Sequence, residues 1–413
     1  MHSLLLTNIQ QLFGVREQSR LLRRKDLAVL PEINQAYLWM ENGLIKAYGP
    51  MSALAGLPEN DVTVMDISGQ TVLPAWCDSH THLVFAASRE HEFIDKIRGL
   101  SYAAIAAKGG GILNSAEKIK NTPETVLFEQ AWQRLQEIIR LGTGAVEIKS
   151  GYGLTVQGEL KMLRVIRKLK EASPIPVKAS FLGAHTYPPN YKNDHQGYIQ
   201  LITEEMLPAI RRENLADYID AFCEEGFFSA EETDAICKAG IRYGLKPKIH
   251  ANQLHLSGGV QTGVALKALS VDHLETMDEA AIQCLAASDT IGTLLPTAAY
   301  FLRMPFQPAR ALIDAGAAIA LASDFNPGSS PSGNMNTVVS MSCIQMKMLP
   351  EEAVNAATMN GAFAMGLEHE MGSITVGKRA NLIITRPVPS LAYIPYAFGT
   401  NLIDKIIING ALY

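Results

Sequence analysis

The amino-acid sequence predicts an α/β protein, a TIM-like (β/α)8 barrel with a small β-sandwich domain built from both ends of the chain. Three observations support this prediction. Eight short apolar runs alternate with helical patterns between about residues 70 and 370. Residues 1–68 and 371–413 instead contain short runs that are typical of β-strands. Side chains able to bind a metal recur at the carboxyl ends of the apolar runs, which meet on one face of a barrel.

The size and composition of the chain are compatible with such a fold. It has 413 residues, and 47% of them are hydrophobic, so a large core can form. The formal net charge of −5 is weak for this length, which argues against nucleic acid or an anionic membrane as a partner. No apolar run reaches the ~20 residues of a membrane span, and the beginning, MHSLLLTNIQQLF, does not resemble a signal peptide.

The five cysteines are scattered along the chain, odd in number and without a C-x-x-C pair. This pattern is typical of free thiols in a reducing compartment. We therefore expect a cytoplasmic protein without disulfides.

The two ends of the chain are expected to form the β domain. In residues 1–68, the sequence ENG at 41–43 lies between apolar flanks and predicts a hairpin. Near the end of the chain, two further segments have sequences typical of β-strands, GSITVGKRANLIITRP and KIIINGALY. We expect residues 1–68 and 371–413 to pair with each other, which leaves residues 69–370 as the barrel.

Eight runs within the central region are predicted to be barrel strands. They are 71–82, 145–153, 176–185, 218–226, 246–252, 268–274, 290–297 and 318–324. Helical patterns separate them, for example at 122–142 and 155–172. Eight such units in succession are typical of a closed parallel barrel.

The stretch WCDSHTHLVF places His80 and His82 two positions apart on the first of these strands. Side chains alternate along a strand, so both imidazoles point to the same side and can reach one cation at about 2.0–2.1 Å. Later runs end on His185, His250, His273 and Asp324. Imidazole and carboxylate together suit zinc or ferrous iron, and such an ion lowers the pKa of a bound water from about 15.7 towards 7. An isolated His-x-His pair is weak evidence, but the combination predicts a metal site.

Several motifs carry a resemblance to known proteins. LPAWCDSHTHLVF resembles the metal signature of the amidohydrolase superfamily, and KSGYGL, GAHTYPP and DFNPGSSP resemble the imidazolonepropionase family within it. That family hydrolyses 4-imidazolone-5-propanoate to N-formimidoyl-L-glutamate, the third step of histidine degradation. The resemblance implies one divalent ion, zinc or iron, and a homodimer. The implied ligands are His80, His82, His250 and Asp324. The fourth run, YIDAFCEEG, contains no lysine that could be carboxylated to bridge two metals.

The same resemblance implies the residues that bind the small-molecule substrate. Arg89 suits its propanoate, since guanidinium groups bind carboxylates in a bidentate manner. The other implied contacts are Tyr152, His185, Gln253, Asn326, Gly328 and Ser329.

The implied catalytic residues are Asp324, His273 and Gln253. We expect Asp324 to shuttle a proton and His273 to donate to the developing oxyanion, to hold the water, or to orient another ligand. Gln253 stands where some relatives have glutamate, and an amide can only form hydrogen bonds. Proton transfer is therefore expected to fall to Asp324 and His273.

Two other functions remain open at this point. One is a different metal-dependent amidohydrolase, such as a deaminase or a cyclic amidase acting on a heterocycle, which would not need a clamp for propanoate. The other is a non-catalytic barrel that has lost its metal and binds a partner.

Lys149, beside Glu147, is expected to form a structural ion pair rather than to act as a catalytic amine. The stretch KGGGIL at 108–113 lacks the G-x-x-x-x-G-K-[ST] pattern, so nucleotide binding is not expected.

Overall fold

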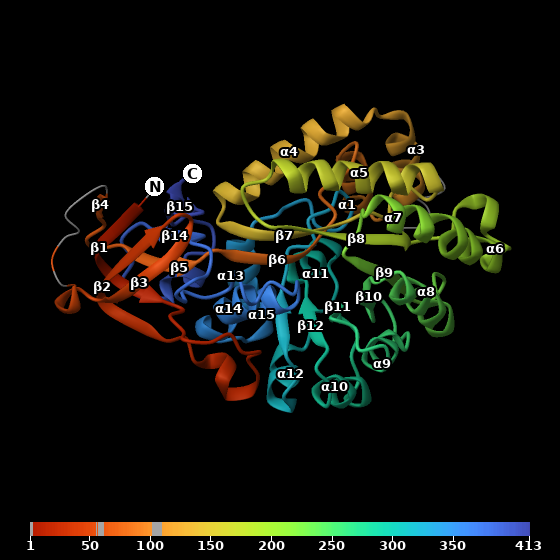
Figure 1. Ribbon diagram of the computed structural model, residues 1–413. Coiled ribbons are helices and arrows are strands. Elements are labelled where there is room, and N and C mark those ends of the chain that lie inside the picture. The colour runs from red at the N-terminus through yellow and green to blue at the C-terminus, as the bar shows by residue number, and fades with distance from the viewer. Residues whose placement is uncertain (1–2, 55, 57–61, 101–109) are drawn as a thin grey trace.

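The computed structural model describes residues 3–54, 56, 62–100 and 110–413, and it has two eight-stranded sheets in this part of the chain. The first two residues of the KGGGIL stretch lie outside the described residues. In Figure 1 the sheet built from the two ends of the chain lies on one side, and the second sheet lies among helices on the other. The predicted fold class is confirmed.

The second sheet is the predicted barrel. Its strands follow one another in chain order and are all parallel. They are β6 (Trp76–Thr81), β7 (Thr143–Lys149), β8 (Val177–Ala184), β9 (Tyr218–Cys223), β10 (Lys246–Ala251), β11 (Ser270–His273), β12 (Ile291–Leu294) and β13 (Ile319–Leu321). Its two ends also meet, because the His82 N–H donates to Phe325 O at 2.9 Å and the Asp324 N–H donates to His80 O at 3.0 Å. These bonds bring His80, His82 and Asp324 side by side.

Helices surround the barrel (Figure 1). They are α1 (Glu90–Ile97), α3 (Gly111–Asn121), α4 (Glu124–Arg140), α5 (Val156–Ala172), α6 (His195–Gln200), α7 (Leu207–Glu213), α8 (Ala230–Arg242), α9 (Gly259–Ala265), α10 (Glu279–Ala286), α11 (Pro296–Leu302), α12 (Ala309–Ala315), α13 (Met335–Met346), α14 (Pro350–Ala357), α15 (Met359–Phe363) and α16 (Tyr393–Tyr396). Both helices predicted at 122–142 and 155–172 are present as α4 and α5.

Helix α5 illustrates how the sequence forms these helices. The Thr155 hydroxyl caps its first turn by accepting the Gly158 N–H. Leu163, Ile166 and Leu169 then recur every three residues and are fully buried in the main core. Packing of this apolar face holds the helix against the barrel.

The sheet from the two ends of the chain has the order β16-β15-β14-β5-β1-β2-β3, with β4 also paired to β1. Its strands are β1 (Ser3–Phe13), β2 (Glu32–Glu41), β3 (Leu44–Pro50), β4 (Thr63–Asp66), β5 (Thr71–Pro74), β14 (Leu382–Thr385), β15 (Ile403–Ile408) and β16 (Ala411–Leu412). The predicted hairpin joins β2 to β3, and Asn42 and Gly43 both have positive φ, as a two-residue turn requires. The domain boundaries at 68 and 371 stay a prediction.

The expected single strand at 71–82 is two strands in the structure. The Ala75 N–H donates to Asn381 O in the terminal sheet, whereas the next N–H, of Trp76, donates to Gly142 O in the barrel. The chain therefore passes from one sheet to the other at this point, which ties the β domain directly to the strand that carries His80.

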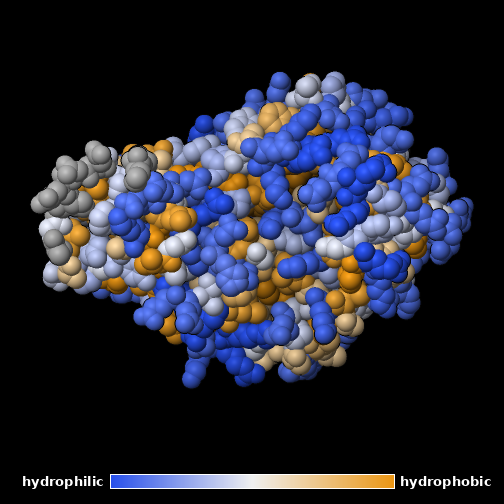
Figure 2. Space-filling model, viewed as in Figure 1, coloured by the Kyte–Doolittle hydropathy of each residue, from blue (hydrophilic) through white to orange (hydrophobic). Residues whose placement is uncertain are grey.

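Two further observations concern the described residues as a group. No helix among them is long and apolar enough to cross a membrane, and on the face in Figure 2 hydrophilic residues cover most of the surface. All five cysteines are unpaired, as predicted, and Cys77 is fully buried in an apolar cluster.

Candidate active site

The four predicted ligands converge at the carboxyl end of the barrel. The Nε2 atoms of His80 and His82 lie 3.3 Å apart, and that of His250 lies 3.4 Å from His82. Asp324 Oδ1 is 3.5 Å from His80 Nε2 and 3.6 Å from His82 Nε2. None of these residues is more than 3% exposed.

This arrangement fits a divalent cation. The Nδ1 of His80 is bonded to Asp272 at 2.7 Å and that of His250 to Asp220 at 3.1 Å, so these carboxylates hold the N–H at Nδ1 and leave the Nε2 lone pairs facing inwards. Burial, followed by the neighbouring cationic groups, holds the pKa of His80, His82 and His250 well below its usual range, so the rings are neutral. Facing lone pairs repel one another, and a divalent cation between them, with ligand bonds of about 2.0–2.1 Å, would remove that repulsion.

Asp324 and His273 stand beside this cluster. Asp324 adopts a left-handed backbone, with φ of 52°, and its Oδ2 accepts the Ser329 hydroxyl at 3.1 Å. Burial raises the pKa of Asp324 to about 6. His273 Nδ1 lies 3.3 Å from Glu275 Oε1. Burial opposes a charge on His273, but the nearby carboxylates of Glu275, Asp324 and Asp272 outweigh it and raise the pKa. Glu275 was not predicted, although its place two residues after a strand-end histidine was visible.

One cavity of about 490 Å³ opens above the cluster and contains nearly all the predicted site residues. Those that line it are His82, Arg89, Tyr152, His185, His250, Gln253, His273, Asp324, Asn326, Gly328 and Ser329. His80 is fully buried and does not line this cavity. The sequence did not indicate Lys96, Phe222 or Met304, which also line the cavity.

Arg89 lies at the N-terminus of α1 and faces the loop that follows β13. Its Nε and Nη2 donate to the Ser115 hydroxyl at 3.0 and 2.7 Å, and its guanidinium carbon lies 5.6 Å from the centre of the Tyr152 ring. Gly328 lies close to this group and leaves space for it because it has no side chain. A Cβ at Gly328 would lie 2.6 Å from Arg89 Nη1. The cavity is therefore lined by a cationic group as well as by the imidazoles.

The glycines of SGYGL shape the wall that carries Tyr152. Gly151 has φ of +108°, and a Cβ there would meet His185 Nδ1 at 2.8 Å. His185 Nδ1 instead bonds Gly151 O at 3.0 Å, and burial lowers the pKa of His185 to about 4, so its ring is neutral. The buried Glu159 carboxylate accepts the N–H groups of Gly151, Gly153 and Leu154, which fixes the loop.

The DFNPGSS loop is held by its own asparagine. Asn326 Oδ1 accepts the N–H groups of Gly328 and Ser329 at 2.7 and 2.8 Å, and Asn326 Nδ2 donates to Asp324 O. These bonds make the loop rigid beside Asp324. They also engage both ends of the Asn326 amide, which supports a shaping role for this side chain.

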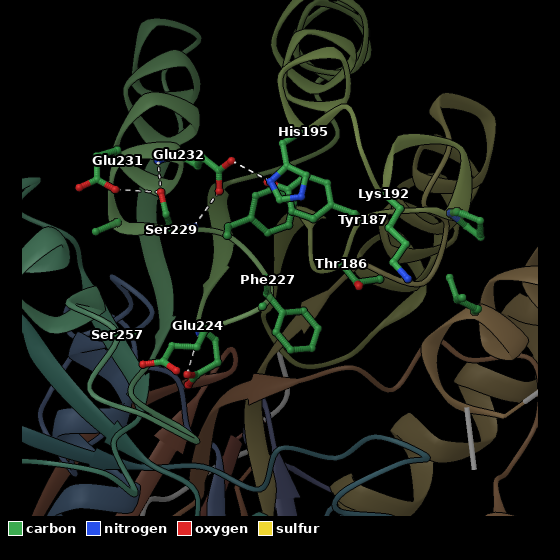
Figure 3. Close-up of a pocket in the computed structure, with 16 residues that line it drawn as sticks. Thr186, Tyr187, Lys192, His195, Glu224, Phe227, Ser229, Glu231, Glu232 and Ser257 are labelled. Atoms are coloured by element: carbon green, nitrogen blue, oxygen red, sulfur yellow. Dashed lines mark hydrogen bonds and ion pairs between the residues drawn. The ribbon is translucent and has the colours of Figure 1, made fainter. Parts of the chain in front are cut away.

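A larger cavity of about 1030 Å³ lies next to the first, and Phe227 lines both. Its wall contains four glutamates, Glu224, Glu225, Glu231 and Glu232. Figure 3 shows Glu231 and Glu232 paired with Ser229, and Glu232 also with His195, across the wall of this cavity. None of the predicted site residues lines this cavity, so the chemistry is placed in the smaller one.

Comparison with known proteins identifies the class. The model of the amidohydrolase family matches residues 71–412. Solved structures with the same fold include the E. coli guanine deaminase, with a TM-score of 0.75 at 15% identity over 100% of this chain and 99% of that one. An adenosine deaminase from Xanthomonas campestris with bound zinc has a TM-score of 0.70 at 16% identity over 100% of this chain and 92% of that one. The chain belongs to the amidohydrolase family, and its cofactor is a metal.

Comparison with individual sequences shows to which family among the amidohydrolases the chain belongs. The imidazolonepropionase of Flavobacterium johnsoniae is 56% identical over 99% of both chains. That of Christiangramia forsetii is 53% identical over 99% of this chain and 100% of its own. Within the amidohydrolases, the chain therefore belongs to the imidazolonepropionase family.

Proposed function

We propose that this site hydrolyses a C–N bond in the ring of 4-imidazolone-5-propanoate, a cyclic amide, to give N-formimidoyl-L-glutamate. The observation that carries the proposal is one cavity with an imidazole and carboxylate cluster on one side and the Arg89 guanidinium on another. A small ring with a carboxylate tail matches both groups at once. The high identity to imidazolonepropionases over the whole chain supports the same reaction.

The proposed cofactor is one divalent ion, zinc or iron, held by His80, His82, His250 and Asp324. When bound, such an ion supplies a water of lowered pKa and polarises a carbonyl. Four carboxylates, of Glu147, Asp220, Asp272 and Asp324, lie in or just below the cluster, against the two ammonium groups of Lys149 and Lys248. A bound cation would offset part of this negative charge, which supports a metal ion at the cluster.

Asp324 is the proposed proton shuttle. One of its oxygens faces the imidazoles and the other accepts the Ser329 hydroxyl, so the carboxylate is fixed at the edge of the cavity. From there it takes a proton from the attacking water and delivers it to the ring nitrogen that leaves. Gln253 lines the same cavity as an amide and contributes hydrogen bonds to the substrate.

His273 is the proposed donor to the carbonyl oxygen. Its Nδ1 is paired with Glu275, which leaves Nε2 as the atom available to the cavity. A donor fixed in advance stabilises the charge that develops on the oxygen in the transition state. Arg89 binds the propanoate, and Tyr152 and His185 form the wall beside the ring. Asn326, Gly328 and Ser329 form the rigid edge at which the substrate is placed.

The proposed location is the cytoplasm, and the proposed assembly is a homodimer. Five unpaired cysteines are consistent with a reducing cytoplasm, and the family resemblance supports a homodimer.

A substrate comparison tests this function. Metal-loaded protein is offered imidazolonepropanoate, freshly made by urocanase, and the loss of its ultraviolet absorbance is followed. We expect rapid loss of the absorbance and no ammonia release from guanine or adenosine. A flat trace with imidazolonepropanoate, together with ammonia release from guanine or adenosine, would assign the site to the deaminases instead.

A further inference from the structure

The barrel interior beneath the imidazole cluster is built from charged side chains. Barrel interiors are usually filled by branched aliphatic residues. Here the four strands β7, β9, β10 and β11 contribute five charged residues with no exposed surface at all, and they are Glu147, Lys149, Asp220, Lys248 and Asp272. Burying an ion costs several kcal/mol even after relaxation, so an arrangement of five points to a role that apolar residues could not perform.

Lys149 lies at the centre of this network. Its Nζ is 2.6 Å from Glu147 Oε1, 2.8 Å from Asp220 Oδ2 and 3.4 Å from Asp272 Oδ2. The expected ion pair with Glu147 is therefore present, but the ammonium also reaches two carboxylates on other strands.

Those two carboxylates are the ones that orient the imidazoles. Asp220 holds Lys149 with Oδ2 and His250 Nδ1 with Oδ1. Asp272 Oδ2 lies 2.7 Å from His80 Nδ1 and also faces Lys149. A single ammonium group thus contacts the orienting partner of two imidazoles that come from opposite parts of the barrel, β6 and β10.

We propose that Lys149 is a positioning residue for the metal site: its ammonium locks Asp220 and Asp272 in the orientation that aims the Nε2 atoms of His250 and His80 at one divalent cation. The proposal rests on the proposed function of this site. Without this ammonium, Asp220 loses its ammonium partner and Asp272 keeps only Lys248, 4.0 Å away, so both carboxylates turn and the imidazoles that they hold turn with them.

Lys248 provides a matched control. It is as buried as Lys149 and pairs with the same Glu147, at 2.5 Å from Oε2. Its other hydrogen bonds go to the backbone, to Ser79 O at 3.0 Å and Ala364 O at 3.1 Å, and Asp272 is 4.0 Å away. Removing Lys248 therefore also takes away one buried ammonium, but Lys149 still contacts both Asp220 and Asp272.

The test compares two double variants, Lys149→Met/Glu147→Gln and Lys248→Met/Glu147→Gln. Each removes one ammonium and one carboxylate, so both keep the net charge of the wild-type network. The metal-free proteins are titrated with Zn²⁺ in competition with a chromogenic chelator, and thermal melting of the same samples reports folding. The absorption spectrum of the Co²⁺-loaded proteins reports the ligand geometry.

We expect the Lys149 double variant to bind Zn²⁺ about 10–100-fold more weakly than the Lys248 double variant, with an altered Co²⁺ spectrum, at similar melting temperatures. Equal affinities for the two double variants would overturn the proposal, and so would weakening caused only by loss of Lys248. Wild-type protein that takes up no Zn²⁺ would instead overturn the metal site itself. A wild type that binds one ion, with the Lys149 variant unchanged, would refute only the positioning role.

Discussion

The substitution Gly328→Ala tests whether Arg89 clamps the substrate carboxylate. A Cβ at this position would lie 2.6 Å from Arg89 Nη1, and an ordinary contact needs at least 3.4 Å. The guanidinium must therefore retreat by roughly 0.8 Å, since the backbone of the DFNPGSS loop is held by Asn326. The end of an arginine side chain moves easily, so we expect the melting temperature to change little.

The effect on binding should be much larger than the effect on folding. Each hydrogen bond to a charged group contributes about 1.5–3 kcal/mol, which corresponds to roughly a 10–100-fold change in affinity. Weakening one of the two bonds of the clamp predicts an increase in KM of roughly 10–100-fold. Because the clamp is the same in ground and transition state, kcat should stay within a few-fold.

Steady-state kinetics of Gly328→Ala, Arg89→Met and the double variant would measure this. If the added methyl acts through the guanidinium, the substitution has little further effect once Arg89 is gone, so the two changes are strongly non-additive. Gly399→Ala, where no atom lies within 4 Å of the added Cβ, controls for a general effect of the substitution. Simple additivity, or an unchanged KM in Gly328→Ala, would refute the clamp.

Three further predictions address other parts of the site and the fold. Asp324→Asn should lose at least about two orders of magnitude in turnover or lose its metal, and near-normal turnover with metal still bound would exclude the proton-shuttle role. Gln253→Glu should keep turnover within about tenfold, because the amide is not required for proton transfer; a far larger loss would show that it is. Burial lowers the pKa of Lys378 from 10.5 to about 8, so above that pH the folded protein binds fewer protons than the unfolded one. Denaturant unfolding should show wild type gaining up to about 3 kcal/mol over Lys378→Met as pH rises from 8 to 10.5, and parallel pH curves would contradict this.

The barrel could be predicted from the sequence because its strands repeat a strong local pattern. Each apolar run has strand length and is followed by a helical period, and this pattern does not depend on the rest of the fold. The break at Ala75 could not be predicted in the same way. The run 71–82 has no polar residue between Val72 and Cys77, and only the partners of successive N–H groups, Asn381 and Gly142, show that two sheets share it.

The same distinction applies to the site. Strand-end residues such as His80 and Asp324 could be predicted to meet because all carboxyl ends of a barrel face one side. The alternation in YIDAFC could also have placed Asp220 on the inner face, a signal that the prediction did not use. Alternation could not place Asp272, because its neighbour His273 also faces the site, with a backbone φ of 88°. Which carboxylate holds which imidazole depends on the stagger between strands far apart in the chain, and no local pattern carries that information.

The central claim is that three imidazoles and Asp324 hold one divalent ion on which turnover depends. Metal-free protein titrated with Zn²⁺, with bound metal and turnover of imidazolonepropanoate measured on the same sample, tests this claim directly. The account predicts that turnover rises in proportion to bound metal and levels off at one ion per chain. Full turnover in the metal-free protein, or a plateau reached only at two ions per chain, would contradict it.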